Sequence, residues 1–158
     1  MTASALTLEI AVEAEGWPDP DDLEAEARTA IAAAMVATGI DEPVSVSLLF
    51  ADDAAIRVLN RDWRGKDKAT NVLSFPAPDT AFPEGPAPMG DIALAFETVT
   101  GEARDEGKPF AHHLAHLIVH GFLHLAGYDH ETDEEAEEME ALERSILATL
   151  AIPDPYAI

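Results

Sequence analysis

The sequence contains no cysteine. Disulfide bridges and thiolate metal ligands are therefore excluded, and any bound metal must be held by histidine or carboxylate side chains. The 158-residue chain also has no apolar run long enough to cross a bilayer, and no basic segment followed by an apolar stretch opens it. We therefore expect no signal peptide, no membrane partner and a cytoplasmic location.

Basic side chains are scarce, because nine lysines and arginines face 31 acidic residues, for a formal net charge of −22. Such a charge argues against nucleic acid as a partner. However, five of the nine basic residues fall within a dozen positions, which we call the basic segment: Arg57, Arg61, Arg64, Lys66 and Lys68. These side chains could bind phosphate groups, or they could merely balance neighbouring aspartates on a solvated helix. Composition alone favours the second interpretation.

The pattern of apolar residues divides the chain into strands and helices. Strands are expected where apolar and polar residues alternate, at 6–12, 44–50, 71–75 and 91–96. Helices are expected from Pro20 to Gly39, after Asp52, around 97–105, from Pro109 to about 126, and after the capping residue Thr132. Residues 76–89 contain five prolines and are expected to form an irregular loop. Because no repeat or linker divides the chain, we expect one domain over residues 1–158.

Three histidines have the spacing of metal ligands in residues 120–130, which read HGFLHLAGYDH. His120 and His124 are four residues apart, so they project from the same face of a helix. Gly127 allows the chain to leave that helix in a left-handed conformation, which can bring His130 back as a third ligand. Catalytic zinc is held by three protein ligands with a fourth position open. We therefore predict one zinc ion per chain, bound by these three histidines.

The residue after the first histidine indicates whether hydrolysis of peptide bonds is expected. The spacing equals that of the metzincin peptidases, H-E-x-x-H-x-x-G-x-x-H. Gly121 stands where those enzymes carry the glutamate that acts as general base. A zinc peptidase without this glutamate lacks its main proton acceptor. The motif therefore indicates a metal-dependent hydrolase and argues against proteolysis.

Residues beside the motif are expected to support the metal ligands. His116 lies one turn before the first ligand, too early to be a ligand itself, and is expected to act as a hydrogen-bonding partner behind the ligands. His112 and His113 are expected at the helix end, either capping it or exposed. The carboxylate of Asp129, next to His130, can accept a hydrogen bond from a ligand imidazole, or it can cap the turn. Both interpretations of Asp129 stay open.

With these residues in hand, the chain resembles the YbeY family of metal-dependent endoribonucleases, also described as rRNA maturation factors. The matching segments are 59–68 (LNRDWRGKDK), 70–76 (TNVLSFP), 90–92, the histidine motif at 116–130 and the acidic run at 133–139. One departure is Ala69, where the family commonly has proline. This difference concerns the rigidity of a loop and not the chemistry.

The resemblance implies an α+β fold, a single domain in which a mostly parallel four-stranded sheet with one antiparallel edge strand packs against helices, including a zincin-like histidine helix. It implies cleavage of single-stranded RNA, with roles in late-stage ribosome quality control and in maturing the 3′ end of small-subunit (16S) rRNA. The implied partners are single-stranded RNA, rRNA and the small ribosomal subunit or its assembly proteins, and not DNA.

The resemblance also places Arg64 in a cleft beside the zinc. There its guanidinium would stabilise the charge that develops on the phosphate during catalysis. Lys66 and Lys68 would bind the substrate by holding flanking phosphates, without choosing its sequence.

Two other functions remain open. A peptidase-like hydrolase would need another base, such as Glu131, and residues 90–96 could accept an extended peptide if they formed an edge strand. A non-enzymatic ribosome assembly factor would use zinc only to staple its fold, although an open coordination position argues against this.

Overall fold

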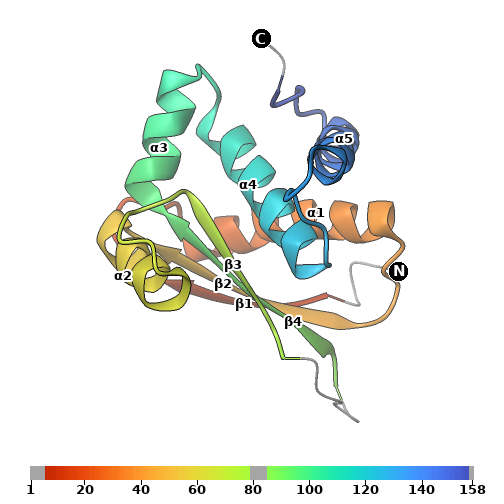
Figure 1. The fold of residues 1–158 in the computed structure, drawn as a ribbon, viewed down its shortest axis with the longest axis horizontal. Helices are drawn as coiled ribbons and strands as arrows, with labels where there is room; N and C mark the ends of the chain where they lie inside the picture. The colour runs from red at the N-terminus through yellow and green to blue at the C-terminus, as the bar shows by residue number, and fades with distance from the viewer. Residues whose placement is uncertain (1–5, 79–84, 157–158) are drawn as a thin grey trace.

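Nine helices and strands follow one another along the parts of the chain that the computed structural model describes, residues 6–78 and 85–156 (Figure 1). The strands are β1 (Leu6–Val12), β2 (Val44–Ala51), β3 (Val72–Pro76) and β4 (Ala87–Ala95). The helices are α1 (Pro20–Thr38), α2 (Asp53–Arg64), α3 (Phe96–Asp105), α4 (Phe110–Leu125) and α5 (Asp133–Thr149).

The four strands form one sheet in the order β1-β2-β4-β3. The β1–β2 and β2–β4 pairs are parallel, and β3 pairs antiparallel with β4 at the sheet edge. The predicted α+β class, with a mostly parallel sheet and one antiparallel edge strand, is therefore confirmed. Strand β4 lies between β2 and β3, so the suggestion that residues 90–96 form an edge strand open to a peptide is wrong.

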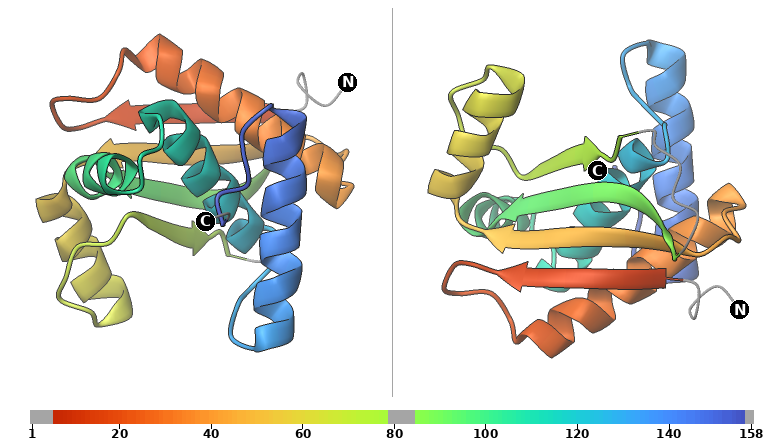
Figure 2. Two further views of the ribbon diagram at one scale, coloured as in Figure 1. Left: turned by 90° about the horizontal axis from the view of Figure 1, so that it is seen from above. Right: turned by 90° about the horizontal axis from the view of Figure 1, so that it is seen from below.

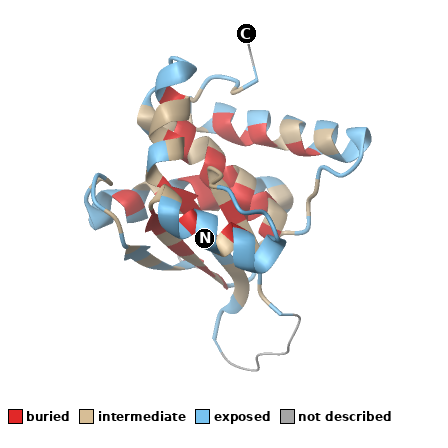
Figure 3. Cartoon of the chain, turned by 60° about the vertical axis from the view of Figure 1, so that its left-hand side comes forward, coloured by how far each residue is buried: buried red, intermediate tan, exposed pale blue. Residues whose placement is uncertain are grey.

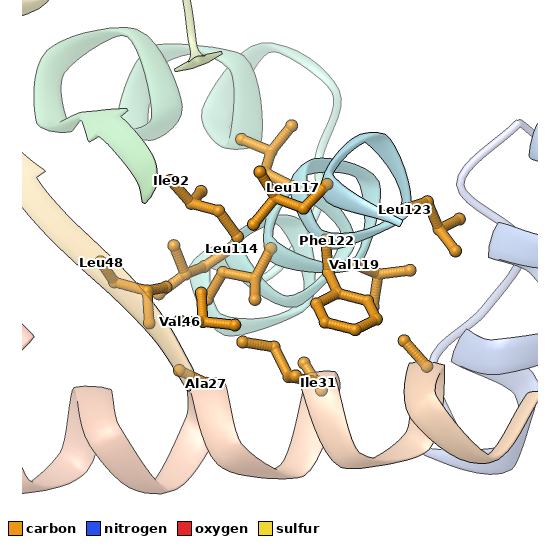
Figure 4. Close-up of a cluster of buried hydrophobic side chains, with 14 of the residues drawn as sticks. Ala27, Ile31, Val46, Leu48, Ile92, Leu114, Leu117, Val119, Phe122 and Leu123 are labelled. Atoms are coloured by element: carbon orange, nitrogen blue, oxygen red, sulfur yellow. The ribbon is translucent and has the colours of Figure 1, made fainter. Parts of the chain in front are cut away.

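Helices cover the two faces of the sheet unequally. On one face, side chains such as Val46, Leu48 and Ile92 pack with residues of α1 and α4 in the main hydrophobic core (Figure 4). On the other face, α2 contributes Ile56 to a small cluster with Ala51, Leu73, Ala93 and Ala95. The right-hand view of Figure 2 looks onto this second face, where the strands lie open beside α2. The unequal cover leaves room for binding sites on both sides of the edge strand β3.

Helix α4 lies in the middle of the molecule, where buried residues gather (Figure 3). It contacts α1, α3, α5 and the strands β3 and β4. This agrees with its sequence, which is apolar on nearly all sides. Burial on all sides fixes the helix axis, so the histidines on α4 project from a rigid support.

The ends of the helices follow the expected chemistry. The side chains of Asp19 and Asp52 accept hydrogen bonds from the first turns of α1 and α2, and Thr132 forms a capping box with Glu135 at the start of α5. The expected irregular loop is shorter than predicted, because Ala87 and Pro88 pair with β2 at the start of β4. The remainder of that loop includes residues 79–84, which lie outside the described residues. Among the described helices, none has the length and apolar character to span a membrane.

Candidate metal centre and adjoining cleft

Ring nitrogens of His120, His124 and His130 lie within 4.8 Å of one another. The Nε2 atoms of His120 and His124, on one face of α4, are 3.1 Å apart. Two nitrogen ligands of a tetrahedral zinc ion stand about 3.3 Å apart, given zinc–nitrogen bonds of about 2.05 Å. The three imidazoles therefore fit a single divalent ion without rearrangement of the helix.

Gly127 adopts a left-handed conformation at the end of α4, as the sequence predicts, and the turn that follows brings His130 close to the other two histidines. Gly127 has a φ of 102°, and its amide donates to the carbonyl of His124 at 3.1 Å. The amide of Tyr128 donates to the carbonyl of Leu123 at 2.9 Å. These bonds close the end of α4. The chain then turns back so that the ring centroid of His130 lies 5.0 Å from that of His124.

Glu143, on α5, holds the other side of the His120 ring. Its side chain is 0% exposed. Oε2 lies 2.7 Å from Nδ1 of His120, and Oε1 lies 2.7 Å from Nε2 of His116. The hydroxyl of Tyr156 also donates to Oε1. When Nδ1–H of His120 donates to this carboxylate, its Nε2 is left as the acceptor atom that faces the metal position.

The electrostatics of the centre keep these groups in the state that metal binding needs. Burial raises the pKa of Glu143, but hydrogen bonds from His116, His120 and Tyr156 outweigh it and hold the pKa at about 2. Burial, together with the nearby His120 and His130, lowers the pKa of His124. Glu143 is therefore ionised and His124 neutral near pH 7. Metals bind the neutral imidazole, so both shifts favour coordination.

Sequence reasoning missed Glu143 and Tyr156. A signal for Glu143 existed, because it lies four residues after Met139 and three before Ile146, both buried on the inner stripe of α5. A carboxylate at such a position needs a buried partner. Tyr156 comes from the segment after α5, and no pattern in the sequence connects it with the histidines.

The other predicted supporting residues have defined places. His116 contacts Glu143, which bridges it to a candidate ligand. Oδ1 of Asp129 accepts a hydrogen bond from the backbone amide of His130 at 2.8 Å, so Asp129 caps the turn. The prediction that His113 caps the helix or is exposed is wrong, because it is buried between α3 and α4. There its Nε2 lies 2.9 Å from Oε1 of Glu102.

A cavity of about 660 Å³ opens beside the three histidines. We call it the histidine cleft. One wall carries Arg64, Lys66 and Lys68 from the end of α2 and the loop that follows it, and Ser74 of β3 lies on another side. Asn60, buried on α2, donates to the carbonyl of Lys68 at 2.9 Å and so ties this loop to the helix. The cleft therefore joins candidate metal ligands and basic side chains within one hollow.

The basic segment has two kinds of members. Nε of Arg57 lies 2.7 Å from Oδ1 of Asp67, and Nε of Arg61 lies 3.1 Å from Oδ1 of Asp62, so these two arginines balance neighbouring aspartates. The three cations that line the histidine cleft make no ion pair within residues 6–78 and 85–156. Their charge is available to an anion in the cleft.

The sheet occupies the place where a metzincin glutamate would begin. A Cβ atom on Gly121 would lie 3.0 Å from Cγ2 of Ile92 and 3.2 Å from Oγ of Ser74. The Ser74 hydroxyl also donates to the carbonyl of Gly121 at 3.0 Å and clamps the helix against β3. A glutamate at this position would therefore push Ile92 or Ser74 away from the helix. Glu131, the substitute base considered for a peptidase, does line the histidine cleft.

Comparisons with known proteins agree with the resemblance in the sequence. The family model described as Endoribonuclease YbeY matches residues 10–151. Endoribonuclease YbeY of Chelativorans sp. (strain BNC1) is 57% identical over 157 residues, covering 99% of this chain and 96% of that protein. Endoribonuclease YbeY of Bradyrhizobium diazoefficiens is 58% identical over 156 residues, covering 94% and 84%.

A solved structure has a similar fold. The solution structure of TM1509 from Thermotoga maritima superposes with a TM-score of 0.58 at 25% sequence identity, covering 96% of this chain and 100% of that chain. The similarity thus extends over nearly the whole chain, including the histidine helix and the basic segment.

Proposed function

The chain belongs to the YbeY family of endoribonucleases, and from this premise we propose that it cuts single-stranded RNA in the histidine cleft, with a metal ion held by His120, His124 and His130. The observation that carries the proposal is the meeting of three convergent imidazoles with unpaired cations in one cavity. The proposed endoribonuclease domain spans residues 1–158.

We propose Zn²⁺, one ion per chain, as the metal. Three imidazoles with an open position suit zinc, and the nitrogen donors support this choice over an oxygen-preferring ion such as calcium. When bound, zinc supplies Lewis-acid catalysis and makes water a nucleophile near neutral pH. Glu143 would orient His120 toward the ion through the Nδ1 hydrogen bond.

The basic wall of the cleft would act on the RNA backbone. Arg64 would donate two N–H groups to the non-bridging oxygens of the scissile phosphate and stabilise the charge that develops there. Lys66 and Lys68 would hold flanking phosphates without selecting a sequence. Because the rest of the molecule is acidic, binding would depend strongly on salt.

The net charge of −22 makes an independent search for RNA inefficient. We propose that the small ribosomal subunit, or one of its assembly proteins, brings the enzyme to its substrate in the cytoplasm. The substrate would be the precursor of 16S rRNA at its 3′ end, and cleavage would serve both maturation and late-stage ribosome quality control. Double-stranded RNA and DNA are not expected substrates.

Elemental analysis coupled to a cleavage assay tests this function. Purified protein is expected to contain one zinc per chain and to cut single-stranded RNA, while matched duplex RNA and single-stranded DNA stay intact. Chelation should abolish cleavage, and added zinc should restore it. Cleavage that survives complete removal of the metal, or zinc-loaded protein that cuts no RNA, would contradict the proposal.

Two arginine variants compare a side chain inside the histidine cleft with one outside it. Arg64→Ala is expected to lower kcat about 10²- to 10³-fold, because it removes an electrostatic contact to the transition state. Zinc content should stay at the wild-type level. Arg57→Ala is the matched control, because Arg57 pairs with Asp67 and does not line the cleft. Equal effects of the two substitutions would remove Arg64 from the catalytic machinery.

The structure argues against the peptidase alternative. The site of the peptidase glutamate is filled by Ile92 and Ser74, and the strand suggested for peptide binding is internal. Casein incubated with zinc-loaded protein should remain intact under conditions in which RNA is cut.

A further inference from the structure

A second cavity, of about 650 Å³, lies on the sheet face opposite α4, and we call it the aromatic groove. Leu59 and Trp63 of α2 form one side, Phe75 of β3 lies beside them, and Leu49 and Ala93 lie on the sheet. The lining is mostly apolar, and Glu9 and Asp91 are exposed acidic residues at the groove. The right-hand view of Figure 2 looks onto this face of the sheet.

Trp63 gives the groove a surface suited to flat ligands. Its side chain is 74% exposed, and it belongs to neither hydrophobic core cluster. Its ring centroid lies 6.3 Å from that of Phe75 at an interplanar angle of 63°. With Trp63 74% exposed, much of the indole surface stays accessible. An exposed tryptophan contributes little to folding, whereas the open face of an aromatic ring stacks well on another planar group.

The groove and the histidine cleft adjoin at the edge of the sheet. Trp63 and Arg64 are consecutive residues of α2, and Arg64 lines the cleft. Pro76, at the end of the edge strand β3, lines both cavities. A strand with one phosphate at Arg64 can therefore place a neighbouring nucleotide in the groove by passing around the end of α2 or the edge strand.

We propose that the aromatic groove binds an unpaired base of the RNA next to the cleaved bond, by stacking on Trp63. This inference rests on the proposed function. Bases of single-stranded RNA are commonly recognised by stacking on aromatic side chains. A base held in a duplex cannot turn into the groove, so the groove contributes to the preference for single strands.

We expect the acidic residues at the groove to repel phosphate groups and to contact the base instead. Glu9 and Asp91 repel phosphate groups, which stay at Arg64 and the lysines. Their carboxylates can accept hydrogen bonds from an exocyclic amine, as carboxylates do from N4 of cytosine. Uracil has no such amine. The groove is therefore expected to favour cytosine over uracil, the two pyrimidines of equal size.

Trp63→Ala tests the groove with a binding readout that precedes cleavage. Zinc-loaded full-length protein is mixed with short oligocytidylate that carries a 5′-fluorescein label, and binding is followed by the anisotropy of the label in a stopped-flow fluorimeter. Trp63→Ala is expected to weaken binding roughly 5- to 150-fold, the usual range for loss of one stacked base. Trp63→Phe should retain most of the affinity, because a smaller ring still stacks. Val58→Ala, which trims an exposed apolar side chain on the same helix and lines neither cavity, should bind like wild type.

Fluorescence and an abasic oligonucleotide locate the contact. The chain has two tryptophans, so the tryptophan emission of Trp63→Phe comes from Trp17 alone. RNA should quench wild-type emission and leave the emission of Trp63→Phe unchanged. Among oligocytidylates with a single abasic position, one should bind wild type as weakly as the intact strand binds Trp63→Ala, and Trp63→Ala should lose no further affinity for it.

The outcomes distinguish the groove from the proposed function. If wild type binds RNA with quenching but cuts none, the proposed function fails and the groove stands. If wild type cuts RNA while Trp63→Ala binds the oligonucleotide equally tightly, or if RNA leaves the emission of wild type unquenched, the inference is overturned. An equal loss of affinity on every abasic strand would also overturn it, because the substitution would then act through the fold.

Discussion

The histidine cleft and the aromatic groove are almost equal in volume, about 660 and 650 Å³, and differ completely in chemistry. The edge strand β3 separates them, and its alternating side chains serve both: Ser74 lines the cleft, and Phe75 lines the groove. In the cleft, the hydrogen bond from Nδ1 to Glu143 orients the ring of His120. In the groove, the lining is mostly apolar, so a ligand would be held mainly by the fit of its surface against the ring of Trp63. The cleft is therefore expected to be sensitive to the loss of a single atom, while the groove tolerates a change of aromatic ring.

Removing a candidate metal ligand is expected to have the largest effect. His124→Ala leaves two imidazoles, so metal affinity should fall by more than about 100-fold, beyond the loss typical of a residue behind the ligands. RNA cleavage should fall below detection. The fold should persist, because the core around α4 does not include the three ligands. Circular dichroism and elemental analysis would check this, and an unfolded variant would instead identify the zinc as a structural staple.

Restoring the peptidase glutamate is expected to damage the fold without giving proteolysis. Gly121→Glu forces a side chain against Ile92 and Ser74 and buries a carboxylate. The free energy of unfolding should fall by about 3 kcal/mol or more, from overpacking plus desolvation of the charge. Urea titration measures the change, and Gly121→Ala, which adds only a methyl group, should lose less. A stable Gly121→Glu protein that digests casein would overturn this account of the helix–sheet contact.

Neutralising Glu143 is expected to lower the zinc affinity, because Glu143 holds the ring of His120 on the side away from the metal position. Glu143→Gln keeps the size of the side chain but removes the charge that the three hydrogen-bonded groups face. Zinc affinity should fall about 10- to 100-fold, measured by competition with a chromogenic chelator. Glu138→Gln changes an exposed acid on the same helix and should bind zinc normally. Equal affinities of both variants and wild type would show that Glu143 does not orient His120.

The lysines of the cleft are expected to have the smallest effect. Lys66→Ala and Lys68→Ala should each weaken RNA binding a few-fold, with kcat nearly unchanged, because they contact phosphates away from the cleaved bond. Each should also reduce the slope of log affinity against log salt by about 0.7. A salt titration of wild type and both variants checks this. A large fall in kcat for either lysine would move it into the catalytic machinery.

Local patterns predicted the elements and the ligand turn because both depend on neighbours in sequence. The alternation of apolar and polar residues predicted the strands. The spacing of His120, Gly127 and His130 predicted the turn at the end of one helix. Glu143 comes from another helix, 23 residues after His120, so only tertiary packing joins them. Its place on the buried stripe of α5 was the one available signal.

Strand order and charge pairing also lay beyond the sequence. Alternation in residues 91–96 indicates a strand, but the same pattern fits an internal or an edge position. Composition could not distinguish the members of the basic segment either. In the structure, Arg57 pairs with Asp67, whereas Arg64 has no ion pair within the described residues. The folded geometry makes this distinction, because it sets which side of α2 faces the cleft.

X-ray absorption spectroscopy at the zinc edge shows whether three imidazoles hold one ion with a position open to the cleft. Full-length protein loaded with one equivalent of zinc should show three imidazole nitrogens at about 2.0–2.1 Å and one oxygen from water. His124→Ala, at a zinc concentration that fills its weaker site, should show one imidazole fewer. A spectrum with fewer than three imidazoles in wild type, or with a fourth protein ligand closing the site, would contradict the account.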